Sequence, residues 1–217
     1  MSMFTQHPFG APTDDATLQA LADLLPLLVS SEDAAIVAFQ RLARDDAFDR
    51  AGAMALAAIE AQEREHFALV DGLSRHLPPA AQARAARHAA RRFHGAIAAP
   101  DAAGALAVVA SIDAGICMIL SRLLRSGGGV SRVPRAAAIL TRIHQEEAGH
   151  VAVSRRLALA SPGATAEGAS ALFSRTCQAR SELAKLVLHF GHGLEALGVD
   201  TDRLVRDLGR VPAGLLS

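Results

Sequence analysis

Apolar residues recur at intervals of three and four positions along most of the chain, and alternating runs of β-branched residues are scarce. This spacing gathers apolar side chains on one face of an α-helix, and the abundant alanines favour helix formation. Glycine and proline divide the pattern into segments. The predicted helical segments are 14–45, 49–76, 79–98, 101–126, 132–160, 165–197 and a short terminal one at 201–209. The pattern therefore predicts an all-α protein.

Pro26 lies inside the first segment and is expected to kink or split it. No long run of Pro, Gly and Ser separates the segments, so residues 1–217 are predicted to form a single domain. The most apolar stretch, residues 106–124, is about as long as a membrane span. Asp113 near its centre would be costly in a bilayer, so a buried helix of a soluble bundle is the favoured interpretation.

The composition narrows the possible functions. Of 217 residues 51% are hydrophobic, and the 22 basic residues balance the 22 acidic ones. A chain of this kind is not expected to be disordered, and its overall charge gives no reason to bind nucleic acid. Cys117 and Cys177 can form at most one disulfide, and residues 1–15 do not have the pattern of a signal peptide. We expect a cytoplasmic protein without a membrane anchor.

One short pattern occurs twice, in segments 49–76 and 132–160. Its members are Leu56, Ile59, Glu63 and His66 in the first segment, and Leu140, Ile143, Glu147 and His150 in the second, each pair offset by 84 residues. On a helix these positions form the single stripe that would face a core. A carboxylate and an imidazole therefore stand, one turn apart, where apolar residues are expected.

The two remaining long segments each carry one carboxylate on their apolar stripe. These are Glu32 in the first segment and Asp113 in segment 101–126. If the segments pair as antiparallel hairpins, each turn should fall midway between the ligands of its pair. The midpoint between Glu32 and Glu63 is 47–48, in a polar break, and that between Asp113 and Glu147 is 130, just after a triple glycine. Two facing Glu-x-x-His turns with two further carboxylates make a six-ligand cage for two metal ions.

This arrangement resembles the ferritin-like di-iron carboxylate superfamily, which includes ferritins, rubrerythrins and di-iron oxygenases, over residues 25–157. The resemblance implies an antiparallel four-helix bundle with a long crossover, its core at about 25–160, to which segment 165–197 adds a C-terminal fifth helix. It also implies that Glu63 and Glu147 bridge two iron ions, or iron and manganese, with His66 and His150 binding one ion each. Glu32 and Asp113 would be terminal ligands, and Asp113 departs from the Glu that is usual there.

The resemblance implies an oxidoreductase that uses dioxygen or peroxide. The absence of Tyr excludes a tyrosyl-radical subunit, and two cysteines are too few for the rubredoxin part of a rubrerythrin. A hydroxylase of a small molecule or of a modified base, a peroxidase and a ferroxidase remain, with an unknown substrate and an electron-donor protein as partners. Alanine-rich faces are compatible with a homodimer. The alternative is a non-catalytic helical bundle, with or without metal, that serves as an interaction or structural module.

Other polar residues carry weaker signals. Glu60, Glu65, Glu146 and His144 flank the repeated pattern and are expected on solvated surface, with Glu60 the one candidate for contact with a ligand. His189 and His192 form a one-turn pair whose expected role is packing or surface rather than metal binding. The basic stretch 84–94 is expected to be a solvated face, because only Phe93 accompanies it as an aromatic platform for a nucleic acid.

Overall fold

The computed structural model describes residues 14–161 and 166–210, which form eight α-helices and one 3-10 turn and contain no β-strand. In chain order the elements are α1 (Asp15–Leu42), α2 (Arg50–Ser74), α3 (Ala83–Ala96), α4 (Ala102–Leu123), η1 (Val130–Arg132), α5 (Pro134–Ala160), α6 (Ala166–His189), α7 (Gly191–Ala196) and α8 (Thr201–Leu208). The prediction of an all-α protein is confirmed.

Four of these helices begin at an aspartate that satisfies a backbone N–H group of the first turn. The caps of α1, α2, α4 and α8 are Asp14, Asp49, Asp101 and Asp200, each accepting a hydrogen bond of 2.7 to 2.9 Å. An aspartate in this position stabilises a helix by about 1 kcal/mol and interacts favourably with the helix dipole. An aspartate cap thus marks the start of three of the four helices that carry the predicted ligands, whereas α5 begins at Pro134 without a side-chain cap.

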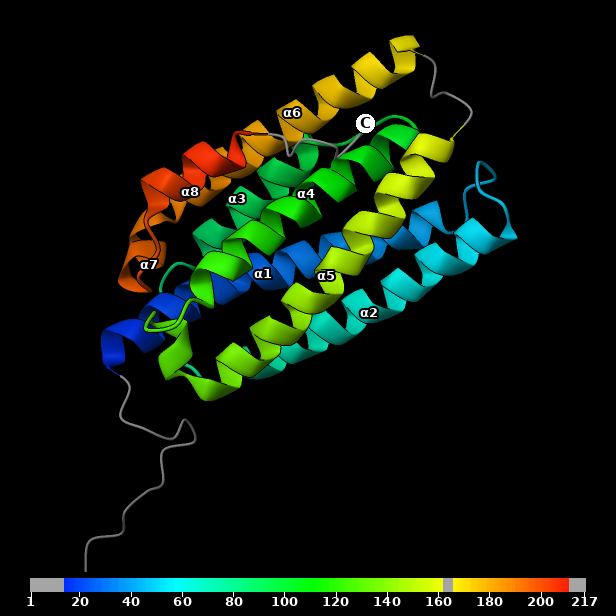
Figure 1. Ribbon diagram of the computed structural model, residues 1–217. Helices are drawn as coiled ribbons and strands as arrows, with labels where there is room; N and C mark the ends of the chain where they lie inside the picture. The colour runs from blue at the N-terminus through cyan, green and yellow to red at the C-terminus, as the bar shows by residue number, and fades with distance from the viewer. Residues whose placement is uncertain (1–13, 162–165, 211–217) are drawn as a thin grey trace, which may run out of the picture.

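Helices α1, α2, α4 and α5, which carry the six predicted ligands, form two antiparallel hairpins, α1 with α2 and α4 with α5, which meet through α2 and α5. The turns lie between Leu42 and Arg50 and between Leu123 and Pro134, and each contains its expected midpoint. Figure 1 shows α1 and α5 running in one direction and α2 and α4 in the other, while α3 returns the chain along the bundle. One long crossover therefore joins the hairpins.

A second layer covers the outer side of the bundle. Helix α6 packs along α4, α8 packs on α6, and α3 contacts both α1 and α6 (Figure 1). Gly115 allows the close approach of α6, since a Cβ atom there would stand 2.3 Å from Leu183 Cδ2. Arg180 of α6 is fully buried and donates a hydrogen bond of 2.8 Å to the Leu208 carbonyl at the end of α8.

The structure corrects two expected boundaries. Helix α1 is not split at Pro26. The proline has no N–H group and so removes one backbone hydrogen bond, but the helix continues to Leu42. The fifth long segment does not continue to 197: α6 ends at His189, and Phe190, which is not helical, separates it from α7. Among the described helices only α4 is long and apolar enough to cross a membrane, and half of its most apolar window is buried within the protein.

The apolar core has two parts, separated along the bundle. One is built around residues such as Leu25, Val70 and Leu140 and extends under α6, α7 and α8. The other, smaller part includes Phe39 of α1 and Leu106 of α4. Since Glu32 lies between Leu25 and Phe39 on α1, the polar positions of the repeated stripes fall in the layer between the two apolar clusters.

Candidate metal centre

All six sequence-predicted ligands meet in this layer. Helix α1 supplies one of them, α2 two, α4 one and α5 two, and no side chain among them belongs to a residue more than 7% exposed. They are Glu32, Glu63, His66, Asp113, Glu147 and His150. The one-turn spacing within α2 and within α5 points the imidazole and the carboxylate of each helix toward the same place. The hairpin geometry expected from the midpoints is therefore the geometry observed.

One group of potential ligands surrounds His66. Its Nδ1 atom lies 3.6 Å from Glu32 Oε2, 3.5 Å from Glu63 Oε2 and 3.6 Å from Glu147 Oε1. Metal–ligand bonds of roughly 2.0 to 2.2 Å place neighbouring ligands of one ion roughly 2.8 to 3.6 Å apart. The four side chains therefore have the spacing of ligands around a single cation, and all their donor atoms lie within 4.8 Å of one another.

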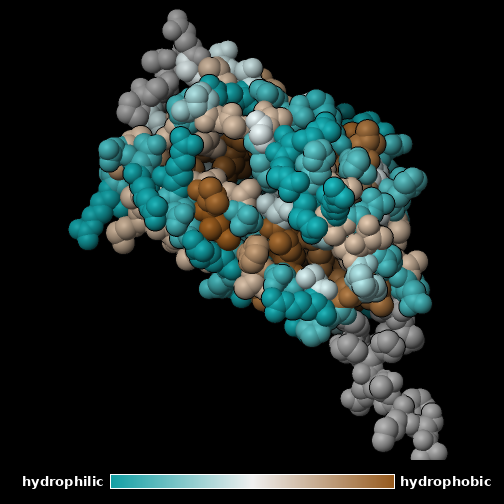
Figure 2. Space-filling model, turned by 180° about the vertical axis from the view of Figure 1, so that it is seen from behind, coloured by the Kyte–Doolittle hydropathy of each residue, from teal (hydrophilic) through white to brown (hydrophobic). Residues whose placement is uncertain are grey.

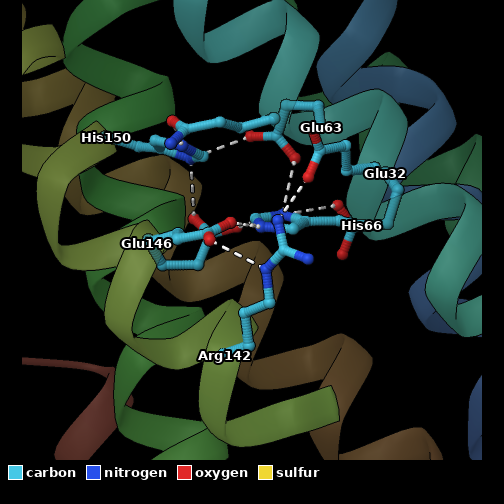
Figure 3. A network of polar contacts seen from close by, with 9 residues as sticks. Glu32, Glu63, His66, Arg142, Glu146 and His150 are labelled. Atoms are coloured by element: carbon cyan, nitrogen blue, oxygen red, sulfur yellow. Dashed lines mark hydrogen bonds and ion pairs between the residues drawn. The ribbon is translucent and has the colours of Figure 1, made fainter.

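A second group surrounds His150 and shares members with the first. The Nδ1 atom of His150 lies 3.0 Å from Glu63 Oε1 and 3.5 Å from Glu147 Oε2, and Asp113 completes a set whose donor atoms fit within 4.8 Å. In Figure 3 dashed lines run from both imidazoles to Glu63, and the two ring centroids are 5.8 Å apart. Glu63 and Glu147 thus each approach both histidines, as carboxylates shared between two ions would.

Four ligand atoms in this centre are buried without a hydrogen-bond partner. They are Glu63 Oε2, His66 Nδ1, Asp113 Oδ2 and His150 Nδ1. Leaving one buried polar atom unsatisfied costs about 1 to 3 kcal/mol, and more when the group is charged. Divalent cations would satisfy all four atoms, and four carboxylates would balance the charge of two such ions. The donor set and its unsatisfied atoms therefore fit a pair of metal ions.

The outward nitrogen of each imidazole is held by a side chain from the opposite helix. His66 Nε2 of α2 lies 2.7 Å from Glu146 Oε2 of α5, and His150 Nε2 of α5 lies 3.0 Å from Gln62 Oε1 of α2. Since both acceptors are oxygens, each Nε2–H donates, so Nδ1 is the nitrogen that faces the carboxylates and would bind a cation once it has lost its proton. Arg142 in turn donates to Glu146 over 2.9 Å (Figure 3) and also pairs with Glu65. Partners of this kind orient a metal-binding histidine.

Glu146 and Gln62 were not identified from the sequence. Glu146 was expected on solvated surface, and this expectation is wrong because its carboxylate reaches across to the other hairpin. Gln62 directly precedes Glu63, and Glu146 directly precedes Glu147, so these two residues are also 84 positions apart. Extending the repeated pattern by one position would have identified both. Glu60 pairs with Arg64 of its own helix. His189 and His192 are exposed on α6 and α7 and take no part in the centre.

Mutual proximity shifts the pKa values of the group. Burial alone lowers the pKa of His66, but Glu147, Glu32 and Glu63 outweigh it and raise the pKa to about 12. The same balance raises the pKa of His150 to about 9, through Glu147 and Glu63. Burial and the neighbouring Glu63 raise the pKa of Glu32 to about 8.

The pKa values of two further carboxylates shift in opposite directions. Burial and the charges of Glu147 and Glu63 raise the pKa of Asp113 well above its ordinary value. Burial also acts to raise the pKa of Glu63, but the neighbouring His150 and His66 outweigh it and lower that pKa to about 2. Without metal the centre therefore retains protons at neutral pH that a cation would displace.

A cavity of about 450 Å³ leads to the centre between α1 and α4. Four of the six potential ligands line its inner end: Glu32, Glu63, Asp113 and Glu147. Figure 2, which views the molecule from behind, shows a hollow on this side whose depth is hydrophobic. The two histidines lie on the other side of the carboxylates, so a molecule in the cavity would approach the centre from its carboxylate side.

No protein-family model, curated protein or solved structure matches this chain. The fold, the six clustered side chains and the cavity are therefore the observations from which a function can be assigned.

Proposed function

We propose that the protein is a ferritin-like di-metal carboxylate oxidoreductase that binds two iron ions, or iron and manganese, and uses dioxygen or peroxide. One observation carries the proposal: buried, unsatisfied donor atoms form two overlapping groups that share Glu147. Unpaired charges in a helical core cost several kcal/mol unless a partner compensates them. Two cations supply that partner, and imidazole combined with carboxylate suits iron and manganese.

The topology supports the same assignment. Two antiparallel hairpins joined by a single long crossover are the arrangement of ferritin-like bundles, in which Glu and Glu-x-x-His residues project into the core. Here α3 lies within the crossover, and the repeated Glu-x-x-His turns lie on α2 and α5. Neither feature depends on the choice of metal.

Each side chain has a defined task in this proposal. Glu32 and His66 would hold one ion and Asp113 and His150 the other, with Glu63 and Glu147 available to both. A pair of iron ions supplies electrons to dioxygen or peroxide. The apolar clusters cover the ligand layer on both sides along the bundle, so access to the centre is through the cavity between α1 and α4.

The substrate sets which reaction takes place. In a hydroxylation, one atom of dioxygen enters the substrate and the other leaves as water, with two electrons and two protons supplied from outside. An electron-donor protein would deliver those electrons. A peroxidase or ferroxidase uses the same centre without inserting oxygen into an organic molecule.

The test is metal content followed by oxygen consumption. Protein reconstituted anaerobically with ferrous iron should bind about two equivalents per chain, and exposure to air with a reductant should then consume oxygen in proportion to the bound iron. Two bound metals without any reaction with dioxygen or peroxide would identify a structural metal site. Protein that binds no metal after reconstitution would contradict the proposal and leave the helical interaction module as the alternative.

A further inference from the structure

We propose that the cavity between α1 and α4 binds a long, unbranched aliphatic carboxylate. Its carboxylate group would lie at Arg41, the middle of its chain beside Glu32 and Asp113, and the end of its chain against α6 and α7. That this molecule is the substrate rests on the proposed function, whereas its binding does not. The length of the cavity, a second cavity that adjoins it and the charged side chains at one end all support this occupant.

The cavity that reaches the centre is elongated along the bundle. On α1 its lining extends over residues 28–42, and on α4 over residues 102–116. At about 1.5 Å per residue each stretch is about 20 Å long. The two helices run in opposite directions (Figure 1), so the last residues of the first stretch and the first residues of the second lie at the same end of the cavity. Glu32 and Asp113 lie partway along, and a space of this shape suits an extended molecule.

A second, smaller cavity continues the first one. Leu28, Ser31, Ile112 and Ile116 line both cavities, so the two adjoin. The second has a volume of about 50 Å³, which holds about three to five groups of the size of a water molecule or a methylene. Side chains of α6 and α7 form part of its wall, and among the described residues that line it only Ser31 is polar. This space suits the end of an alkyl chain.

Apart from the carboxylates of the centre, the charged side chains lie at the other end. Arg41, Asp45 and Asp101 line the first cavity where α1 ends and α4 begins. Asp45 already accepts a hydrogen bond from a backbone N–H group of its own turn, and Asp101 caps α4 and pairs with Arg175. The exposed guanidinium of Arg41 has no hydrogen bond or ion pair with the described part of the chain. The charge left for a ligand to pair with is therefore positive, which favours an anionic group.

A carboxylate at Arg41 keeps its contact with water, because that side chain is exposed. Carrying the charge further would remove its hydration among side chains such as Val109 and Ile112, where no cation compensates it. An uncharged aliphatic chain meets no such cost and gains free energy from burial along the same wall. The polar group and the chain therefore have separate places in the cavity.

The positions along α1 set the length of the chain. Glu32 lies nine residues before Arg41, about 13 Å along the helix, and Leu24 of the second cavity lies seventeen residues before it, about 25 Å. An extended alkyl chain advances about 1.25 Å per carbon, given C–C bonds of about 1.5 Å. A chain of about 16 to 20 carbons therefore fits, and its carbon at about the tenth position lies beside the centre.

The first test measures how binding depends on chain length in the whole protein. Dodecanoate, tetradecanoate, hexadecanoate and octadecanoate are titrated against bound cis-parinarate, a fluorescent fatty acid that each of them displaces. We expect each added methylene to tighten binding about 4-fold, because it is buried in the cavity. Affinities that do not rise beyond dodecanoate would overturn the proposal, since the second cavity would then hold no part of the chain.

A variant of the second cavity tests where the chain ends. Leu186 of α6 lines that cavity, and Leu186→Phe should fill it, so that octadecanoate binds no more tightly than tetradecanoate. Leu188→Phe is the matched control, because Leu188 lies on the same helix and is 59% exposed. Ile119→Phe on α4 gives the same test if Leu186→Phe does not fold. An unchanged length dependence in a folded variant of this cavity would contradict the placing of the chain.

The charge of the ligand is tested with probes that share one chain. We expect hexadecanoate to bind about 2- to 5-fold more tightly than 1-hexadecanol, the effect of an exposed ion pair, and hexadecyltrimethylammonium to bind most weakly. Arg41→Gln should remove the difference between the acid and the alcohol. Arg44→Gln, an exposed arginine at the same end of α1 that does not line the cavity, should retain it. Equal binding of acid and alcohol to the wild type would overturn the assignment of the carboxylate to Arg41.

Metal-loaded protein locates the chain and separates the two proposals. With Mn²⁺ bound, the middle carbons of ¹³C-labelled hexadecanoate should show broader resonances than the carboxyl carbon and the terminal methyl, with Zn²⁺-loaded protein as the diamagnetic reference. Strongest broadening at the carboxyl carbon would overturn the proposed orientation. Two bound metals without binding of hexadecanoate would overturn the substrate inference and leave the centre intact. Length-dependent binding without any metal would overturn the proposed function and leave the cavity site.

Discussion

The α1–α2 hairpin and the α4–α5 hairpin supply the centre with nearly the same residues at an offset of 84 positions, yet they differ at two points. The shared Glu and the His are identical in both: Glu63 and His66 in one hairpin, Glu147 and His150 in the other. The terminal carboxylate is Glu32 in the first hairpin and Asp113 in the second. The residue before the shared Glu is Gln62 in α2 and Glu146 in α5.

These differences make the two halves of the centre chemically unequal. His66 donates to a carboxylate, whereas His150 donates to a neutral amide. A carboxylate partner increases the basicity of a metal-bound imidazole, so in the proposed centre His66 would be the stronger ligand. Asp113 is one methylene shorter than Glu32 and belongs to the weaker side as well. We therefore expect the ion at His66 to bind more tightly than the ion at His150.

The largest effect should come from removing what the halves share. Glu147→Ala and Glu63→Ala should each reduce the bound metal from about two equivalents to none, because each carboxylate approaches both histidines. Elemental analysis after anaerobic reconstitution measures this. Glu65→Ala is the matched control on the exposed side of α2, and it should retain both ions. A variant without one shared carboxylate that still holds two ions would show that this carboxylate is not shared.

Exchanging the terminal carboxylates should change one site at a time. Asp113→Glu should preserve or raise occupancy at the His150 side, because the longer side chain reaches as Glu32 does. Glu32→Asp should instead lower occupancy at the His66 side and make the two halves more alike. A titration with ferrous iron that resolves two binding steps measures both changes. A sharp loss of one ion in Asp113→Glu would mean that the short side chain is required at that position.

The sequence was sufficient to predict that these six buried side chains lie in one layer, because helical periodicity is a strong signal. Glu63 and His66 stand where apolar residues belong, and their repeat at Glu147 and His150 ties two distant segments together. The hairpin turns follow from the same positions. Periodicity says little about where a helix breaks: Pro26 does not end α1, and the helical pattern does not reveal the interruption at Phe190.

Contacts between helices were harder to predict than positions on one helix. Glu146 lies beside the apolar stripe of α5 rather than on it, so helical periodicity predicts that it faces solvent. Its side chain nevertheless reaches His66 in the other hairpin. His94 was assigned to a solvated basic face for a similar reason, yet it packs toward Ser30 and the cavity. Both side chains depend on how two elements are placed relative to each other, which a single-helix pattern does not record.

A smaller change in metal affinity should follow when the hydrogen-bond partners of His66 and His150, which are Glu146 and Gln62, are made alike. Glu146→Gln should weaken the ion at His66 by about 10- to 100-fold, the usual loss when such a partner is removed from a metal-binding histidine. Gln62→Glu should act in the opposite direction and tighten the ion at His150. Arg142→Gln, which removes only the partner of Glu146, should have a weaker effect than Glu146→Gln. Equal affinities at the two sites in the wild type would contradict the expectation that the ion at His66 binds more tightly than the ion at His150.

Metal affinity should also change with pH. The pKa values of His66, His150 and Glu32 are raised to about 12, 9 and 8, so all three groups carry a proton at pH 7 in the metal-free protein. A metal ion needs the deprotonated forms, so binding must release these protons and must weaken as the pH falls. Each released proton changes the apparent binding constant about tenfold per pH unit.

The comparison between the halves also predicts where that slope changes. As the pH rises through 8, Glu32 ionises before metal binds, so the His66 side should release one proton fewer above pH 8, whereas His150 keeps its proton until about pH 9. Anaerobic Mn²⁺ binding between about pH 6.5 and 8.5, followed by electron paramagnetic resonance of the free ion, measures the slope. In Glu32→Gln the change of slope near pH 8 should disappear, because no carboxyl group is left there to ionise. An affinity that does not depend on pH over this range would show that the cluster holds no displaceable protons.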